Sequence, residues 1–264
     1  MQEKSYGGVI YLTSHNVRVT HAFTTRFGGI SRGIYESLNL GIGFGDEPGN
    51  VAENFGLICS ALGISDSDIV CSRQVHGAHI RTVSRNDCGG LYSQTRHEAD
   101  GLITCDPGVA LAVFTADCVP ILLHDPVRGA IGAVHAGWRG TAANIAGAAV
   151  KSMTGAFGCS PADISVAIGP CISKCCYETD RDVADAILEA LPEASAACVC
   201  TRNGKYMVDL KEANRFLLYV AGIQDVAISD ECTSCRKDKY WSHRRTSGHR
   251  GSQAGIIVNR KVPS

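Results

Sequence analysis

Residues 115–140 read TADCVPILLHDPVRGAIGAVHAGWRG and carry the clearest strand and turn signals of the chain. Two apolar runs, 119–124 and 130–136, flank a segment with strong turn chemistry that begins with Asp125. The pattern predicts a β-hairpin closed by the loop 125–128, and that loop sets Cys118 opposite His135. Directly opposed residues share one face of a sheet with β-carbons about 4.5–5.5 Å apart. The hairpin therefore predicts a thiolate and an imidazole that can bind one metal ion.

A third ligand is expected in the run RQVHG, where His76 precedes a glycine between a short strand and the extended run HIRTVS. Spacing alone does not choose His76 over His79 or His97. Three protein ligands leave a fourth position open, as in catalytic zinc sites, although copper competes for the same donors. A metal-free alternative uses Cys118 as a nucleophile and His135 as its base.

Polar residues beside these ligands are further candidates. Asp117 precedes the cysteine and is expected on the opposite face, where it orders the loop or a neighbouring arginine. Arg139 lies in the run GWRG that enters a helix, and Arg26 stands beside paired glycines in TTRFGGISRG. Both arginines suit an anion, and so does the basic run WSHRRTSGHRG near the carboxyl end.

Helix signals begin at Asn50, Thr141, Asp180 and Asp209, each followed by a periodic apolar run. Short strand-like runs lie between them without strict alternation of strand and helix: VRVTHAFTT, HIRTVS, VALAVFTA, VPILLH, AIGAVHA, ISVAIG, DVAISD and GIIVNR. We therefore expect an α+β fold with mixed sheets. Because no repeat or linker interrupts the chain, a single domain over residues 1–264 is expected.

Composition narrows the functional classes. The 264 residues include 25 Lys plus Arg against 26 Asp plus Glu, so no positive excess exists to bind nucleic acid or a membrane surface. The chain begins without a secretory pattern and has no apolar run approaching about 20 residues, which predicts a cytoplasmic protein. An odd number of cysteines, 13, indicates reduced thiols.

The remaining cysteines leave several interpretations open. Cys232 and Cys235 have ligand spacing, while Cys171, Cys175 and Cys176 form a second group. A structural zinc site, a redox-sensitive pair and incidental buried thiols are the alternatives, because one CxxC without a clear partner pair is weak evidence.

Ten runs in matching order, from about residue 20 to 258, resemble the YfiH family, also called the laccase-domain or peptidoglycan editing factor family: FTTRFGGIS, YESLNLG, GDEP, RQVHG, EADGLIT, TADCVPILL, VHAGWRG, IGPCI, CCYE and SHRR. The resemblance implies an α+β fold of the YfiH/CNF-like kind, with mixed sheets flanked by helices. It also implies zinc ligands at His76, Cys118 and His135. The chain departs from the family at His243, where Tyr or Phe is usual.

The resemblance implies phosphorolysis of adenosine, inosine, guanosine and methylthioadenosine, together with deamination of adenosine. The partners are then a nucleoside and phosphate, with Arg26, Arg139 and Arg244 as phosphate ligands and Cys118, His135 and Asp117 as catalytic residues. Three alternatives stay open: a cytoplasmic hydrolase that edits a peptidoglycan precursor, a copper phenol oxidase, and a metal-responsive or redox-responsive protein without activity. The nine histidines include no His-x-His pair, which disfavours the oxidase. Oligomeric state is left open by the sequence.

Overall fold

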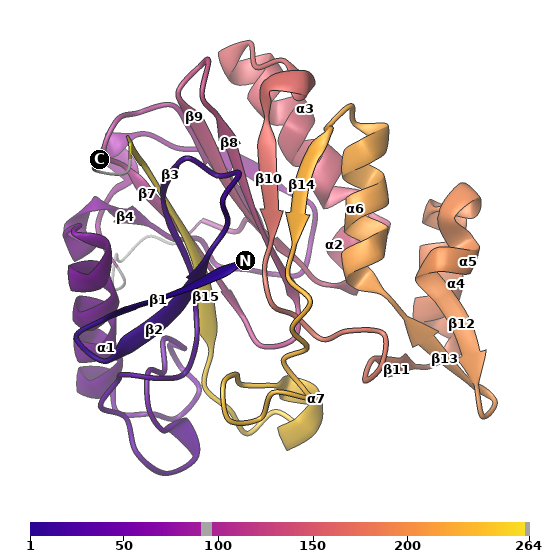
Figure 1. The fold of residues 1–264 in the computed structure, drawn as a ribbon, viewed down its shortest axis with the longest axis horizontal. Helices are drawn as coiled ribbons and strands as arrows, with labels where there is room; N and C mark the ends of the chain where they lie inside the picture. Colours follow the sequence, from indigo (N-terminus) through magenta and orange to yellow (C-terminus); the bar gives the residue numbers. More distant parts are fainter. Residues whose placement is uncertain (91–96, 262–264) are drawn as a thin grey trace.

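Two six-stranded sheets form the centre of the computed structural model, which describes residues 1–90 and 97–261. Figure 1 shows the two sheets side by side, with the N-terminal hairpin β1–β2 at one edge of the first. In spatial order, the first sheet consists of β1 (Gln2–Tyr6), β2 (Val9–Thr13), β3 (Val19–Thr24), β15 (Gln253–Lys261), β7 (Ala110–Thr115) and β4 (Ile69–Val70). Its strands are antiparallel except for the β4–β7 pair.

The second sheet is also mixed and contains the predicted hairpin. Its strands, in spatial order, are β14 (Asp225–Ile228), β10 (Ser165–Ile168), β8 (Val119–Asp125), β9 (Ala130–Ala136), β6 (Gly101–Thr104) and β5 (Ile80–Thr82). A small third sheet projects to one side, with β11 (Glu178–Thr179), β13 (Lys205–Val208) and β12 (Val199–Arg202).

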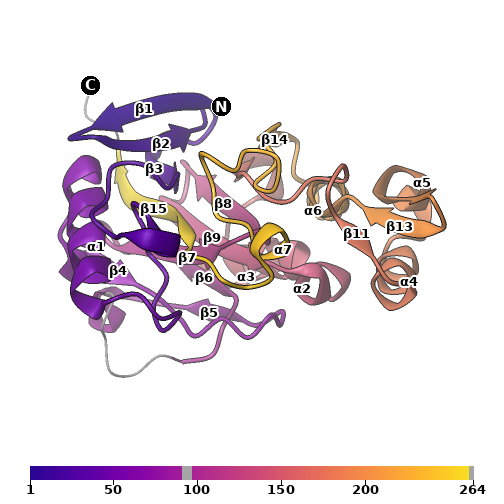
Figure 2. The ribbon, with the colours of Figure 1, turned by 90° about the horizontal axis from the view of Figure 1, so that it is seen from below.

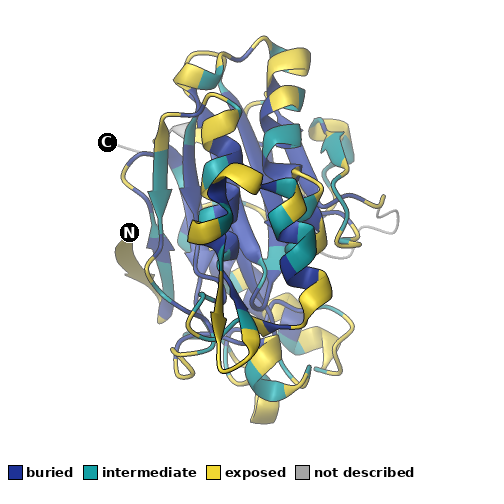
Figure 3. Ribbon diagram, turned by 90° about the vertical axis from the view of Figure 1, so that its right-hand side faces the viewer, coloured by how far each residue is buried: buried dark blue, intermediate teal, exposed yellow. Residues whose placement is uncertain are grey.

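Helices cover the outer faces of both large sheets and give four layers (Figures 1 and 2). One apolar core lies between the sheets, a second lies under α1, and a third lies under α3, α4 and α6. Figure 3 shows helices buried on their inner sides and exposed on their outer sides. The helices are α1 (Pro48–Leu62), α2 (Trp138–Ala142), α3 (Ile145–Phe157), α4 (Arg181–Ala190), α5 (Ser195–Cys198), α6 (Leu210–Val220) and α7 (His243–Thr246).

The predicted α+β class with mixed sheets flanked by helices is confirmed. The helix starts at Asp180 and Asp209 are also confirmed, and the Asp209 carboxylate caps α6 by accepting from the Glu212 N–H. None of the helices in the described ranges is both long and apolar enough to cross a bilayer.

Two predicted helix starts are wrong. The first helix begins at Pro48 rather than at Asn50, because proline is well suited to the first helical position. The helix predicted from Thr141 is split into α2 and α3 by Asn144, whose φ of 57° is left-handed and whose side chain caps α3 through the Gly147 N–H. Asparagine tolerates this conformation better than most residues.

The predicted hairpin register is wrong by one residue on each side. Asp125 is still paired, with Ala130, and its Oδ1 accepts the N–H groups of Val127 and Arg128 at 2.8 and 3.0 Å. The loop is therefore 126–129, and His135 pairs with Pro120 instead of Cys118. Because the shift totals two residues, Cys118 stays on the same face of the sheet as His135.

Each of the eight predicted strand runs contains all or part of a strand of the structure. The N-terminal hairpin β1–β2 and the small third sheet were not predicted. All five residues of β1 are exposed, and of the ten residues of β11, β12 and β13 only Thr179, Met207 and Val208 are buried. Strands without an apolar face leave little periodic signal in the sequence.

Candidate metal centre and cavity

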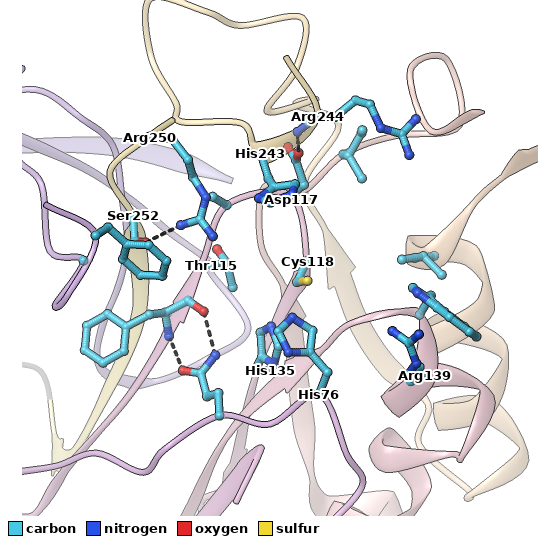
Figure 4. Close-up of a pocket in the computed structure, with 18 of the residues that line it drawn as sticks. His76, Thr115, Asp117, Cys118, His135, Arg139, His243, Arg244, Arg250 and Ser252 are labelled. Carbon is cyan, nitrogen blue, oxygen red and sulfur yellow. Dashed lines mark hydrogen bonds between the residues drawn. The ribbon is translucent and has the colours of Figure 1, made fainter. Parts of the chain in front are cut away.

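Three potential metal ligands meet where the space between the two large sheets opens. His76 lies in the loop between β4 and β5, Cys118 in the bend between β7 and β8, and His135 near the end of β9. Their ligand atoms all lie within 4.8 Å of one another. The imidazole rings of the two histidines meet edge to face, with centroids 4.8 Å apart, below the Cys118 sulfur (Figure 4).

Backbone conformation directs these side chains. His76 has a φ of 60° and Asp117, just before the cysteine, has a φ of 90°. Such left-handed conformations are uncommon for residues other than glycine and cluster at functional sites. Two of the three candidate ligands therefore sit at or beside strained turns, while the third is fixed by a strand.

Asp100 orients both histidines. One carboxylate oxygen accepts from the His76 backbone N–H at 2.9 Å and lies 2.8 Å from His135 Nδ1. The other accepts from the N–H groups of Val75 and Gly77 at 3.1 and 2.7 Å. Asp100 is fully buried, and its hydrogen bonds to three backbone N–H groups hold the His76 loop in place. Because Nδ1 of His135 is engaged by Asp100, Nε2 is the nitrogen free to bind a metal.

The electrostatics of the site favour a thiolate. Burial alone raises the pKa of the Cys118 thiol, but the charge and hydrogen bond of His135 and the hydrogen bond of His76 lower that pKa to about 6. Burial opposes the charged form of His135, whereas Cys118 and Asp100 raise the pKa of its imidazole to about 9. Burial raises the pKa of Asp100, but the hydrogen bonds of this carboxylate with His135, Gly77 and Val75 and the charge of His135 lower it below its usual value. A negative sulfur is the form that binds metals and acts as a nucleophile.

Asp117 points away from the three candidate ligands, as expected from its position next to Cys118. Its Oδ1 accepts from the Thr233 hydroxyl at 2.6 Å, and its Oδ2 accepts from Ser242 Oγ at 3.0 Å and the Arg244 N–H at 2.7 Å. The carboxylate therefore ties the Cys118 bend to α7 and the loop before it. These hydrogen bonds indicate that Asp117 positions the Cys118 bend relative to α7.

A cavity of about 540 Å³ opens over the three residues, within the range of small-molecule sites. Aromatic side chains line it at Phe44, Phe114, Trp138 and Tyr177, and polar groups include Gln74, Thr115, His243 and Ser252. Gln74 is held by two hydrogen bonds of 2.7 Å to the Phe114 backbone. The wall thus combines flat apolar faces with convergent polar groups.

Four arginines line the cavity: Arg73 in the loop after β4, Arg139 at the start of α2, Arg244 in α7, and Arg250 before β15. Arg73 pairs with Glu98, and Figure 4 shows the other three on different sides of the Cys118 sulfur. Arg250 is anchored by Ser252 Oγ at 2.7 Å. Burial lowers the pKa of Arg250, while the negative charges of Cys118 and Asp117 oppose that change. Positive charge therefore faces the cavity from several directions.

The structure does not bring Arg26 to this cavity. Its guanidinium donates to the Glu36 carbonyl and stacks on the buried Trp241 ring at 5.1 Å, and Arg26 is not a lining residue of the cavity. Gly28, which follows it, packs directly against the backbone of another segment, because a β-carbon on Gly28 would lie 2.2 Å from the Gly8 carbonyl oxygen. The pattern that suggested an anion site belongs to a packed turn.

Asp100 and Arg250 are among the residues of the site that the sequence analysis missed. Asp100 lies in the run EADGLIT, and an acidic residue directly before a buried strand was the available signal. Arg250 lies in the basic run near the carboxyl end, where nothing in the sequence separates it from Arg244 and Arg245.

The chain matches, over residues 20–260, the sequence model of the family described as multi-copper polyphenol oxidoreductase laccase. It belongs to this laccase-domain family. Two relatives of the family are named purine nucleoside phosphorylases. YlmD of Geobacillus stearothermophilus is 41% identical over 244 residues, which cover 90% of this chain and 89% of the relative. The Deinococcus radiodurans protein is 40% identical over 250 residues, which cover 95% and 93%.

The fold of this laccase-domain protein agrees with the same grouping. The crystal structure of the Bacillus licheniformis hypothetical protein YfiH superposes with a TM-score of 0.91 at 36% identity, covering 97% of this chain and 98% of that one. The resemblance to the YfiH family is thereby confirmed. The names of the relatives indicate a phosphorylase-type enzyme, and the family together with the His and Cys clusters indicates metal binding.

Proposed function

We propose that this protein is a zinc-dependent purine nucleoside phosphorylase whose metal ligands are His76, Cys118 and His135. One observation carries the proposal: three ligand atoms within 4.8 Å of one another lie in a cavity that four arginines also line. The names of the relatives supply the reaction class. Nucleoside and phosphate are accordingly the proposed substrates.

The residues present fit a metal ion. Two imidazoles and one thiolate form a donor set typical of zinc, and copper is the competing occupant. Asp100 holds the imidazole of His135 so that Nε2 faces the Cys118 sulfur. When bound, the ion supplies a positive charge and an open coordination position beside the substrate.

The arginines suit phosphate. Arg139 and Arg244 are exposed at the cavity wall, and guanidinium groups bind phosphate oxygens through paired N–H groups. In the reaction a phosphate oxygen forms a bond to C1′ of the ribose while the bond from C1′ to the purine nitrogen breaks. The products are ribose 1-phosphate and the purine base, which takes a proton. Of the predicted phosphate ligands we retain these two and replace Arg26 with Arg250.

The base needs an apolar slot and a hydrogen-bond donor. Phe44, Phe114 and Trp138 offer aromatic faces for a purine. Burial, followed by the negative charge of Cys118, raises the pKa of the Tyr177 hydroxyl to about 12, so this group stays protonated. We assign it as a donor to the departing base, and we assign Asp117 as the residue that positions Cys118 and Arg244.

The proposed substrates are adenosine, inosine, guanosine and methylthioadenosine, with deamination of adenosine as a second activity of the same site. A hydrolase that edits a peptidoglycan precursor is the second candidate function. The Cys118–His135 pair favours it, because a thiolate beside an imidazolium is also the arrangement of a cysteine nucleophile. A copper phenol oxidase of the multicopper kind is disfavoured, because such an enzyme needs several histidine-rich copper sites. Among the residues that the structure describes, only one group of potential metal ligands contains histidine.

The test is chromatography of the products formed from adenosine, with and without phosphate, by the zinc-loaded protein and by Cys118→Ser. We expect adenine and ribose 1-phosphate only when phosphate is present, a smaller amount of inosine in both cases, and loss of all products in the variant. Full turnover by Cys118→Ser refutes the proposed zinc role. Hydrolysis of an acyl substrate such as a peptide amide that survives metal removal, together with a trapped thioester between its acyl group and Cys118, supports the hydrolase instead.

A further inference from the structure

Four cysteines form a second cluster outside the cavity. Cys175 and Cys176 lie in the turn between β10 and β11, and Cys232 and Cys235 lie in the turn after β14. Their sulfur atoms all lie within 4.8 Å of one another. Cys171, which the sequence grouped with the first pair, is buried and lies outside this cluster.

The sulfur separations match ligands of one metal ion. Cys175 Sγ lies 3.7 Å from Cys176 Sγ and 3.6 Å from Cys235 Sγ, and Cys176 Sγ lies 3.4 Å from Cys235 Sγ. A tetrahedral ion with zinc–sulfur bonds of about 2.3 Å sets its sulfur ligands about 3.8 Å apart. A disulfide needs about 2.05 Å. Four sulfurs at these separations can surround a single ion, and none is at disulfide bonding distance in the pairs measured, so the geometry favours a mononuclear tetrathiolate site over two disulfides.

The backbone around Cys232 is arranged to stabilise negative sulfur. The Ser173 N–H donates to Cys232 Sγ at 3.3 Å, and the N–H groups of Ser234 and Cys235 are directed at the same atom. Such N–H groups offset the charge of a thiolate. This arrangement is an observation independent of the sulfur separations, because it depends on the backbone of two turns.

Backbone contacts also hold the two turns together. Cys171 and Cys232 form a parallel bridge, and the Thr233 N–H donates to the Cys171 carbonyl at 3.1 Å. The ligand-bearing segments are therefore docked by contacts that do not involve the four sulfurs.

We propose that Cys175, Cys176, Cys232 and Cys235 bind a structural zinc ion, separate from the ion of the cavity. Four protein ligands leave no open position, which is the arrangement of structural zinc. The proposal stands independently of the phosphorylase reaction.

The position of this site gives it a role in shaping the cavity. Tyr177 follows Cys176 directly, and the Arg244 guanidinium donates to the Cys176 carbonyl at 3.4 Å. Thr233, between the two ligands of the second turn, donates to Asp117. The bound ion therefore fastens the segment of Tyr177 to the segment that supports Cys118.

The first test is zinc stoichiometry after loading and removal of free metal. We expect two zinc ions per chain in the wild type, and one in the double variant Cys175→Ser/Cys235→Ser. Cys118→Ser is also expected to bind one zinc ion, but in this variant the ion remains at the four-cysteine site and the cavity site is lost. The two variants therefore test the two metal sites separately. The matched control replaces two exposed cysteines outside both clusters, Cys105→Ser/Cys200→Ser, and keeps two ions. A double variant with the wild-type zinc content overturns the proposal.

A second test needs no substitution. Alkylation of the wild-type protein, followed by peptide mass spectrometry, measures each thiol with zinc bound and after its removal. We expect zinc to slow alkylation of Cys175 and Cys235 at least tenfold while leaving the exposed Cys105 and Cys200 unchanged. Cobalt in place of zinc is expected to give the intense thiolate-to-metal absorption of a four-sulfur site, which the double variant lacks. Equal alkylation in both states, or a Cys175–Cys235 disulfide in the zinc-loaded protein, overturns the proposal.

Discussion

Replacing Asp100 with asparagine tests the support of the candidate metal ligands. The carboxylate takes part in four hydrogen bonds, two at each oxygen, with Val75, His76, Gly77 and His135. Asparagine has one side-chain oxygen in place of two. In either orientation of the amide, its NH₂ group therefore replaces one carboxylate oxygen and faces the two partners of that oxygen. If the amide nitrogen faces His135, it favours a proton on Nε2 and so blocks the ligand atom.

The expected loss follows from these contacts. Hydrogen bonds to a charged group contribute about 1.5–3 kcal/mol each, so losing two of them lowers the free energy of unfolding by about 3 kcal/mol or more. Loss of such support typically costs about 10–100-fold in metal affinity. Competition with a chelator of known zinc affinity measures the second quantity, and urea unfolding of the metal-free protein measures the first.

The control for this experiment is Glu98→Gln, an acid-to-amide change two residues earlier at an exposed ion pair with Arg73. We expect it to change zinc affinity less than twofold. The reasoning is refuted if Asp100→Asn binds zinc as tightly as the wild type and unfolds at the same urea concentration.

Three further changes probe the ligand geometry, the packing and the phosphate site. Gly137→Ala sets a β-carbon 3.0 Å from His76 Cδ2 and 3.4 Å from Cys118 Sγ, so zinc affinity is expected to fall about tenfold; an unchanged chelator titration contradicts this. Gly169→Ala sets a β-carbon 2.3 Å from the Phe23 ring, and such overpacking costs about 1–3 kcal/mol in urea unfolding; a stability equal to the wild type's argues against the packing described. Arg139→Gln removes one charged phosphate contact and is expected to raise the KM for phosphate about tenfold or more at unchanged zinc content, whereas an unchanged KM removes Arg139 from the phosphate site.

The sequence predicted the elements that carry a strong periodic or capping signal. The hairpin strands and the helices after Asp180 and Asp209 are where they were expected. The register was not predictable from turn composition alone, because Asp125 both ends the strand and accepts the N–H groups of the turn. Cys118 and His135 still lie close together as predicted, because a register shift of two residues leaves the side chains on the same face of the sheet.

The sequence could not identify residues whose roles depend on distant segments. Asp100 contacts His76 and His135, which lie 24 and 35 positions away, and no local pattern marks that convergence. Arg26 and Arg250 both lie beside glycines, but only the packing of their loops shows that the first stacks on Trp241 and the second lines the cavity. The cysteine cluster likewise joins two turns almost 60 residues apart along the chain.

The central claim is that one metal ion is held by His76, Cys118 and His135 in the arginine-lined cavity. X-ray diffraction from crystals of the zinc-loaded protein, measured above and below the zinc absorption edge, tests it directly. We expect an anomalous peak about 2.0–2.3 Å from an imidazole nitrogen of His76, the Cys118 sulfur and Nε2 of His135. A zinc-loaded crystal without a peak at this position contradicts it.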